Sequence, residues 1–537
     1  MIILSINFNH DGSAVILKNG IIKSYINTER FSRIKKHPGI RQEDLDLLLH
    51  NAQISLNDIN IVLLNNWHDK NLDSQEIIEL YGDDLKSSWF DFYVQGSKLK
   101  KVIINDIKLD CLINPSHHLL HCSLAYFTSP FSSAVSFSWD PTGYGVFHCK
   151  ENNINKIDID LGFSISKLAT AIYSEASSII FGSGLFGAGK VMGLAPYGYE
   201  STNFHSNEFY LTYTDFNKLV RESDNSLVWY YDKGDKWNAK LAYNVQRFME
   251  EQLVVILDKL YDYCSLNDLE PNICLSGGGA LNSVANQVAF KRSKFKNIFL
   301  HPACGDDGTA IGAALWYWHD VLGNSKREFS NNELMYSTIT YEDEIHDLLF
   351  SGEFEDKLQI EKCDDYIKKT ASLIADGNVI GWFQGASELG PRALGNRSIL
   401  GDPRNESMKD ILNSKVKFRE GFRPFAPSVL NEFAEEWFGL KDSPFMLRVC
   451  NVLKSGLPGI THIDKSARIQ TVAEIDNPNY YELITEFYKI TGVPLIIDTS
   501  FNIKGEPIVE TPRHAIDCFL NTGIDYLVFP RFILKKK

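Results

Sequence analysis

The sequence predicts a mixed α/β fold, because short apolar runs of strand length alternate with longer segments of helical periodicity. Three apolar runs are expected to form buried strands, namely Val135–Trp139, Asn272–Leu275 and Ile298–Leu300. Apolar residues recur with helical spacing in Gln42–Ala52 and Tyr243–Tyr263. Glycine-rich segments stand where a predicted strand passes into a helix, which is the usual layout of an α/β protein.

The chain opens with a predicted β-hairpin. The first strand is Ile2–Phe8, and Asn9–Gly12 turns the chain into the apolar run Ala14–Leu17. Asn19-Gly20 is a strong tight-turn signal, and Ile21–Ile26 completes the antiparallel unit.

A polar stretch without apolar periodicity, Gly323–Asp343, marks a predicted domain boundary. The 537 residues suffice for about three or four folding units, which we group into domains 1–345 and 346–537. The second domain is expected to contain a helix, a strand, a basic loop, a late strand and a polar loop: Tyr366–Asp376, Val379–Phe383, Glu388–Pro427, Pro494–Ile497 and Asp498–Asn502.

Composition narrows the function classes. The formal net charge of −14 and a pI near 5.5 argue against nucleic acid as a general partner. Nine cysteines without a CxxC pair favour reduced thiols and a cytoplasmic location. The N-terminus lacks a basic leader, and the longest stretch free of charged residues, Cys111–Trp139, contains three histidines and two prolines. We therefore expect neither a signal peptide nor a membrane span.

The segment Glu388–Pro427 reverses the sign of the charge in this acidic chain. Between Arg392 and Arg423 it carries eight Lys or Arg against four Asp or Glu. Its glycines and prolines indicate loops rather than a long helix. Three aromatic residues stand among the charges and indicate partial burial: Phe418, Phe422 and Phe425. Because buried cations need partners, we interpret this basic tract as a phosphate-type anion site rather than a solvated surface run.

A histidine pair suggests a metal site. Ser116–Tyr126 is predicted to be one helix, on which His117 and His121 share a face. Asp140, at the end of a predicted strand, and Asp306, in a glycine-rich loop, could complete the ligand set. Nitrogen and oxygen ligands suit Fe(II), Mn(II) or Zn(II), and the spacing does not choose among them. The alternative is a pair of histidines that form hydrogen bonds in the core.

Three glycine-rich segments are candidate phosphate-binding loops: Ser276–Asn282, Gly305–Gly312 and Gly182–Gly198. In the first, Gly277 and Gly278 follow a predicted strand and precede a helix, so backbone N–H groups could face a phosphate. Each segment alone could equally be a packing turn, and no Walker or dinucleotide signature is present. Two such loops on successive strands favour nucleotide binding in a cleft.

Several longer motifs resemble one family over nearly the whole chain. They are His10–Ala14, Glu29–Arg33, Gly189–Ala195, Gly390–Ser398, Phe422–Pro427, Ala467–Val472 and Thr499–Asn502. In this order they resemble the O-carbamoyltransferases of nodulation and antibiotic biosynthesis, relatives of the tobramycin and cephamycin carbamoyltransferases. The family usually has glycine after the aspartate matched by Asp140, whereas here Pro141 follows and restricts the backbone.

The resemblance implies a two-domain enzyme. Its N-terminal domain would have the actin-like ATPase and sugar-kinase fold of threonylcarbamoyl transferases, and its C-terminal domain would be YrdC-like. The C-terminal domain would form carbamoyl-adenylate from the co-substrates carbamoyl phosphate and ATP. The N-terminal domain would then transfer the carbamoyl group to a hydroxyl of a small molecule, such as a sugar or another secondary metabolite, with release of AMP.

The resemblance also implies roles for individual residues. The residues implied to bind carbamoyl phosphate or nucleotide are Arg392, Lys417, Arg423, Ser500 and Asn502. The implied metal ligands are His117, His121, Asp140 and Asp306, commonly with Fe(II). His10 would take the proton of the acceptor hydroxyl, for which a neutral histidine is suited near pH 7.

Two other function classes are open at this point. A kinase or ATPase of the actin-like fold would explain the glycine loops but leaves the basic tract without a role. A non-catalytic nucleotide-binding relative would need neither the cations nor the histidines and aspartates. Modification of tRNA is disfavoured by the acidic charge, and a homodimer is left open.

Overall fold

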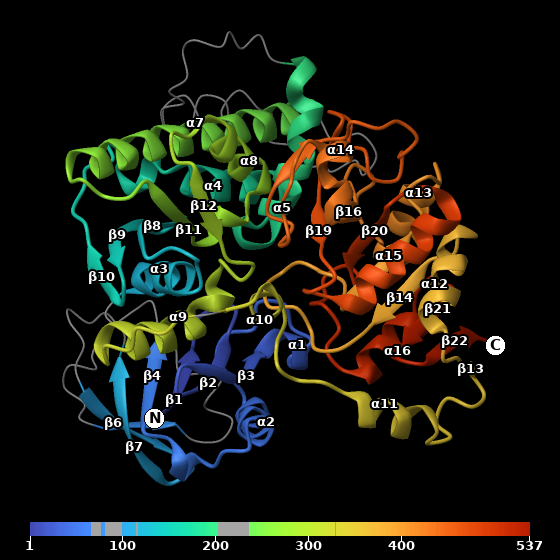
Figure 1. The fold of residues 1–537 in the computed structure, drawn as a ribbon, viewed down its shortest axis with the longest axis horizontal. Helices are drawn as coiled ribbons and strands as arrows, with labels where there is room; N and C mark the ends of the chain where they lie inside the picture. Colours follow the sequence, from blue (N-terminus) through green and yellow to red (C-terminus); the bar gives the residue numbers. More distant parts are fainter. Residues whose placement is uncertain (66–76, 81–98, 114–115, 202–235, 328) are drawn as a thin grey trace.

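The computed structural model describes residues 1–65, 77–80, 99–113, 116–201, 236–327 and 329–537 (Figure 1). The described residues form three large β-sheets with helices on their faces, which confirms the mixed α/β class. The sheets have the strand orders β3-β2-β1-β4-β7-β6-β5, β10-β9-β8-β11-β12 and β13-β22-β21-β14-β15-β20-β16-β19.

The N-terminal sheet begins with the predicted hairpin. β1 (Ile2–Asn7), β2 (Ser13–Lys18) and β3 (Ile21–Asn27) pair antiparallel, and β4 (Ile61–Asn65) lies parallel to β1. The short helix α1 (Thr28–Ser32) follows β3, and α2 (Gln42–Ala52) has the bounds that the sequence predicts. The remaining strands of this sheet are β5 (Ile77–Leu80), β6 (Leu99–Ile104) and β7 (Ile107–Ile113).

The second sheet brings the carboxyl ends of three parallel strands to one edge. These are the strands predicted from apolar runs: β8 (Ser133–Asp140), β11 (Asn272–Ser276) and β12 (Asn297–Leu300). The antiparallel strands β9 (Gly143–Lys150) and β10 (Asn153–Lys156) extend its other side. Asp140, the Gly277-Gly278 turn and the loop that contains Asp306 therefore meet at the same edge.

Two helices lie between these sheets (Figure 1). α3 (His117–Phe127) packs on the second sheet, and α9 (Thr309–Trp316) packs on the first. Gly312 allows the close approach of the two helices, because a Cβ there would lie 2.1 Å from the carbonyl oxygen of Leu120. This packing holds the histidines of α3 beside the loop that precedes α9.

One glycine segment was wrongly interpreted as a loop. Gly182 ends helix α4 (Ala169–Phe181), but Gly184–Leu194 is helix α5. A Cβ on Gly184 or Gly187 would lie 2.4 or 2.2 Å from serine hydroxyls of α4, so these glycines allow two helices to pack closely. With α4, the long helix α7 (Lys236–Leu266) and α8 (Ser283–Arg292) cover the outer face of the second sheet.

The C-terminal sheet is mixed and has helices on both faces. The strands are β13 (Leu358–Lys362), β14 (Ile380–Phe383), β15 (Arg397–Gly401), β16 (Ala426–Leu430), β19 (Gln470–Val472), β20 (Leu495–Ser500), β21 (Tyr526–Phe529) and β22 (Phe532–Lys536). α12 (Tyr366–Ala375) and α15 (Pro478–Thr491) pack on one face, and α16 (Pro512–Leu520) packs on the other.

Shorter elements join these layers. They are α10 (Asn331–Met335), α11 (Glu342–Leu349), α13 (Met408–Ile411), α14 (Ala434–Phe438), and the paired strands β17 (Val449–Asn451) and β18 (Ser466–Arg468). Residue 345 falls within α11, and the boundary there stays a prediction. One hydrophobic core cluster includes residues of both the N-terminal and the C-terminal sheet.

The basic tract contains more regular secondary structure than its glycines and prolines predict. It contains strand β15, helix α13 and a π-helical turn, Leu412–Lys417. The predicted burial of its aromatic residues holds for Phe425, which is 2% exposed, but is wrong for Phe418, which is 49% exposed. Phe418 has a left-handed backbone (φ 48°) at the end of the π-helical turn, which directs its ring outward.

None of the nine cysteines, all of which the structure describes, forms a disulfide. Within the described residues, no single helix is long and apolar enough to cross a membrane. By length and composition alone one bent pair would pass, α4 with the helical segment Gly184–Tyr199, which meet at 87°.

Candidate functional site

A cavity of about 1140 Å³ lies between the N-terminal and C-terminal parts of the chain. Its walls include the loop after β1, the end of β8, the basic tract and the loop after β20. Nine of the site residues predicted from the sequence line it: His10, Asp140, Gly278, Asp306, Arg392, Lys417, Arg423, Ser500 and Asn502. Gly277, His117 and His121 are outside this lining.

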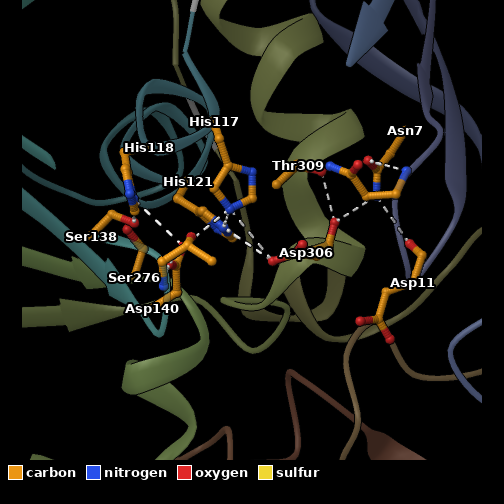
Figure 2. A network of polar contacts seen from close by, with 12 residues as sticks. Asn7, Asp11, His117, His118, His121, Ser138, Asp140, Ser276, Asp306 and Thr309 are labelled. Atoms are coloured by element: carbon orange, nitrogen blue, oxygen red, sulfur yellow. Dashed lines mark hydrogen bonds and ion pairs between the residues drawn. The ribbon is translucent and has the colours of Figure 1, made fainter. Parts of the chain in front are cut away.

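Two histidines and two carboxylates converge where α3 meets the ends of β8 and β12 (Figure 2). The Nε2 atoms of His117 and His121 lie 3.0 Å apart. Asp140 Oδ2 lies 3.2 Å from His117 Nε2, and Asp306 Oδ1 lies 3.3 Å from His121 Nε2. The structure thus brings together the four side chains that the resemblance implies as metal ligands.

Pro141 does not turn Asp140 away from this cluster. Asp140 Oδ1 accepts hydrogen bonds from the backbone N–H and the hydroxyl of Thr142, at 2.8 and 2.6 Å, and from the Gly143 N–H at 3.0 Å. The turn that contains the proline therefore uses one carboxylate oxygen. The other oxygen, Oδ2, faces His117.

The donor atoms of the cluster fit a divalent cation. Single ligand atoms of His117, His121 and Asp140 all lie within 4.8 Å of one another. Asp306 Oδ2 and His121 Nδ1 are buried without a hydrogen-bond partner among the described residues. Burial would raise the pKa of Asp306, but His117, His121 and His10 outweigh it and hold the carboxyl below its usual range. Buried, ionised carboxylates beside imidazoles suit Fe(II), Mn(II) or Zn(II).

His10 lies at the cavity end of this cluster. It stands in the loop after β1, and its side chain is 33% exposed. Its Nε2 atom is 3.6 Å from Asp306 Oδ2. An imidazole in this place can contact both the cavity and the carboxylate of the candidate metal site.

The cavity lining also includes a set of cations that we call the cation set: Arg392, Lys417, Arg419, Arg423 and Arg468. Among the described residues, Arg392, Arg419 and Arg468 have no carboxylate within 4 Å. Burial, and then repulsion by the other arginines, lowers the pKa of Arg468 and of Arg419 far below the usual value. Three partly buried arginines without a neighbouring carboxylate form a site that an anion would stabilise.

Sequence reasoning missed Arg419 and Arg468. Arg419 stands inside the basic tract and lies over the ring of Phe425, 4.5 Å from its centroid. Arg468 ends β18 and belongs to the Ala467–Val472 motif, which was noted only as a sign of the family. That motif was the signal that could have identified Arg468.

Lys417 differs from the arginines because the protein already surrounds its ammonium group. It is 3% exposed and donates to Ser500 Oγ at 3.2 Å, to Asn502 Oδ1 at 2.6 Å, and to both backbone carbonyls. The structure therefore brings Lys417, Ser500 and Asn502 together. Through these bonds Lys417 orders the loop after β20 against the cavity.

Not every cation of the basic tract faces the cavity, and the anion site within it stays a prediction. Arg397 is fully buried and donates to the carbonyl oxygens of Gln384 and Gly385, at 2.6 and 3.0 Å. Its guanidinium also lies 3.5 Å from the centroid of the Phe383 ring. Arg404 forms an ion pair with Asp402. These two residues stabilise the C-terminal fold.

The two glycines after β11 have different roles. Gly277 has φ 81°, and a Cβ there would lie 2.4 Å from the carbonyl oxygen of Trp139. Only glycine fits at position 277, because the backbone is left-handed and a side chain would collide with Trp139. Gly278 lines the cavity, and a Cβ there would meet no atom within 4 Å. Of the two, only Gly278 is placed to face a ligand.

Asp498 is a cavity carboxyl that sequence reasoning did not select. It lies on β20, and its Oδ2 accepts hydrogen bonds from the hydroxyls of Tyr480 and Ser428, at 2.9 and 3.1 Å. Burial raises the pKa of Asp498 to about 7 from an ordinary value of 3.8. The carboxyl is thus half protonated near neutral pH.

This pKa predicts a pH-dependent stability. Between about pH 4 and pH 7 the folded state keeps a proton that the unfolded state has lost, so stability falls as pH rises through that window. Asp498→Asn removes the titration and keeps an oxygen acceptor. Relative to the wild type we expect it to gain up to about 4 kcal/mol between pH 4 and pH 8. Urea denaturation at both pH values tests this, and equal pH slopes for the two proteins would contradict it.

Comparison with known proteins identifies the family. The family models for the carbamoyltransferase N-terminus and C-terminus match residues 2–315 and 371–536. An uncharacterized protein of Synechocystis sp. is 33% identical over 98% of this chain and 95% of its own length. The nodulation protein NolNO of Sinorhizobium fredii is 32% identical over 99% of this chain and 79% of its own.

Solved structures are more distant. An activator of 2-hydroxyisocaproyl-CoA dehydratase from Clostridium difficile shares 15% identity, with a TM-score of 0.33, over 59% of this chain and 94% of its own. The sequence comparisons decide the assignment, because both family models match in order and relatives above 30% identity span nearly the whole chain. The chain therefore belongs to the carbamoyltransferase family and is a carbamoyl-transferring enzyme.

Proposed function

We propose that the enzyme is an ATP-dependent O-carbamoyltransferase that works in two steps within one cavity. In the first step water releases phosphate from carbamoyl phosphate, and the carbamate formed attacks the α-phosphorus of ATP to give carbamoyl-adenylate and pyrophosphate. In the second step the carbamoyl group passes to a hydroxyl of a small molecule and AMP leaves. The observation that supports this most is that one cavity is lined both by the cation set and by members of the histidine–aspartate cluster. The same cavity can therefore bind the anionic reactants at the cation set and carry out a metal-assisted transfer beside Asp140 and Asp306.

The cation set suits the first step. Carbamoyl phosphate and the triphosphate of ATP both carry several negative charges, and Arg392, Arg419 and Arg468 have no carboxylate partner among the described residues. Guanidinium groups at fixed positions would hold these phosphates in line for reaction. Gly278 and the loop that contains Ser500 and Asn502 would contact the nucleotide.

His10 suits the second step. A carbamoyl carbon is a weak electrophile, so the adenylate supplies a good leaving group. His10 Nε2 would take the proton of the acceptor hydroxyl while the hydroxyl oxygen attacks the carbamoyl carbon and AMP departs. A divalent cation held by His117, His121, Asp140 and Asp306 would stabilise the negative charge that develops on the leaving phosphate.

Several further features belong to the same proposal. The N-terminal domain is proposed to have the actin-like fold of threonylcarbamoyl transferases, and the C-terminal domain to be YrdC-like. Fe(II) is the proposed metal, and a cytoplasmic location without a nucleic-acid or membrane partner is proposed from composition. The acceptor is proposed to be a sugar or another secondary metabolite.

The test is product analysis of the purified, metal-loaded enzyme. With ATP and carbamoyl phosphate we expect pyrophosphate, and no pyrophosphate when carbamoyl phosphate is omitted. Labelled carbamoyl phosphate offered with a panel of hydroxyl compounds should then label one of them. ADP in place of pyrophosphate and AMP would instead support a kinase or ATPase of the actin-like fold.

A further inference from the structure

The loop His10–Gly12 places an acidic residue, Asp11, beside the imidazole of His10. Asp11 Oδ2 accepts a hydrogen bond from His10 Nδ1 at 2.8 Å, and the same oxygen accepts one from Lys36 Nζ at 2.8 Å. The three side chains form a chain of contacts from lysine to carboxylate to imidazole. All three line the cavity.

A second set of contacts fixes the place of this loop. The side-chain amide of Asn7, at the end of β1, donates to the backbone carbonyls of Asp11 and Asp306, each at 3.2 Å (Figure 2). Asn7 is fully buried. Thr309 donates to the same carbonyl of Asp306 at 2.7 Å. One amide therefore sets the separation between the loop of His10 and the loop of the candidate metal site.

We propose, on the basis of the proposed function, that Asp11 and Lys36 are positioning residues that orient His10 for proton transfer. An ionised carboxylate only accepts hydrogen bonds, so it holds the proton of the neutral imidazole on Nδ1. The lone pair then lies on Nε2, the atom that is 3.6 Å from Asp306 Oδ2. In this tautomer Nε2 is the atom that would accept the proton, at the side of the candidate metal site.

Lys36 keeps Asp11 in the form that this role requires. Burial alone would raise the pKa of Asp11, but Lys36 and His10 outweigh burial and hold it below its usual value. The side chains of Asp11 and Lys36 are 14% and 22% exposed. Lys36 also balances the charge of Asp11, so a carboxylate can face the imidazole within a partly buried loop.

The proton-transfer step follows the logic of a carboxylate–histidine pair. The acceptor hydroxyl gives its proton to Nε2, its oxygen bonds to the carbamoyl carbon, and the bond from that carbon to the AMP oxygen breaks with its electrons on AMP. The imidazolium formed is stabilised by Asp11 and later loses the proton to solvent. The carboxylate itself does not take the proton.

Two substitutions separate the contributions of Asp11. Its backbone is left-handed, with φ 61°, a conformation that asparagine and glycine both tolerate. Asp11→Asn keeps an oxygen acceptor for His10 and Lys36 but removes the charge. Asp11→Gly removes the acceptor as well. Asp106→Gly is the matched control, because Asp106 has φ 65° in an exposed turn between β6 and β7.

The first measurement is the ¹⁵N spectrum of the imidazoles in full-length enzyme loaded with diamagnetic Zn(II). The His10 signals are identified by their loss in His10→Gln. We expect the proton on Nδ1 in the wild type and in Asp11→Asn, and a shift of the proton toward Nε2 in Asp11→Gly. A wild-type His10 protonated on Nε2, or the same tautomer in wild type and Asp11→Gly, would overturn the proposal. This measurement needs no acceptor and no turnover.

The second measurement is turnover, with water as the hydroxyl acceptor. Asp11→Gly should lower AMP release by roughly 10²–10⁴-fold, and Asp11→Asn should lower it less. The first-turnover burst of pyrophosphate, which precedes the transfer step, should keep the wild-type rate and amplitude in both variants and in Asp106→Gly. Loss of this burst in parallel with AMP release would show that Asp11 acts on folding or on the first step and would refute the positioning role. Absence of pyrophosphate from the wild type would instead refute the proposed function, and the imidazole spectrum would still decide the placement of His10.

Discussion

Arg392→Ala should lower carbamoyl-phosphate-dependent pyrophosphate release by roughly 10²–10³-fold, as expected when one fixed donor to a developing charge is removed. Arg392 lines the cavity, and its Nε is buried without a hydrogen-bond partner among the described residues. Burial lowers its pKa to about 10, which still leaves it charged at neutral pH. Its Nη2 donates to the carbonyl oxygen of Leu281 in a long hydrogen bond of 3.3 Å. The remaining donors are available to a phosphate.

Two further variants serve as controls for Arg392→Ala, one conservative and one at the surface. Arg392→Lys keeps the charge but not the planar pair of donors, so its rate should lie between wild type and alanine. Arg513 pairs with Glu353 at the surface, 46% exposed, and Arg513→Ala should keep the wild-type rate within about twofold. Undiminished pyrophosphate release by Arg392→Ala would refute the anion-binding role of Arg392.

The elements predicted best from the sequence are those with a local pattern. α2 was predicted with its bounds because its apolar residues repeat along one face, and the strands β8, β11 and β12 were predicted from their apolar residues. β8 and β11 are buried as predicted, whereas in β12 only Leu300 is buried. α5 was missed because glycine normally lowers helix propensity. Its glycines are explained only by the nearness of α4, which is a tertiary contact that no local pattern contains.

In the candidate site, too, residues with a local sequence pattern could be predicted, and residues placed by tertiary contacts could not. Helical spacing placed His117 and His121 on one face without any tertiary knowledge. The cation set could not be predicted from charge alone, because Arg397 and Arg392 look alike in the sequence. Arg397 faces backbone carbonyls, whereas Arg392 faces the cavity. Arg468 joins the cation set only because β18 brings it there from outside the basic tract.

His117→Ala should abolish metal binding at micromolar metal and lower carbamoyl transfer by at least about 10²-fold, while the first-turnover burst of pyrophosphate is retained. The expected loss exceeds the 10–100-fold effect of changing a residue behind the ligands, because His117 supplies a ligand atom itself. Its Nε2 is within 3.7 Å of His121 Nε2, Asp140 Oδ2 and Asp306 Oδ1. His117 is one of the groups that hold the pKa values of Asp140 and Asp306 below the usual range. Without its imidazole, the charged forms of these two carboxyls would lose that stabilisation.

The neighbouring histidine provides the control on the same helix. His118 Nδ1 lies 3.1 Å from Ser138 Oγ, and burial lowers its pKa to about 3, so it is neutral. His118→Asn can keep a hydrogen bond to Ser138 and should keep stoichiometric metal, measured by elemental analysis after gel filtration.

Transfer at the wild-type rate by metal-free His117→Ala would contradict the ligand role. Loss of both half-reactions in His117→Ala, with a lowered denaturation temperature, would show instead that the imidazole is needed for the packing of α3. A retained pyrophosphate burst separates these outcomes, because the residues of the cation set lie outside α3 and the proposed first step does not use the metal.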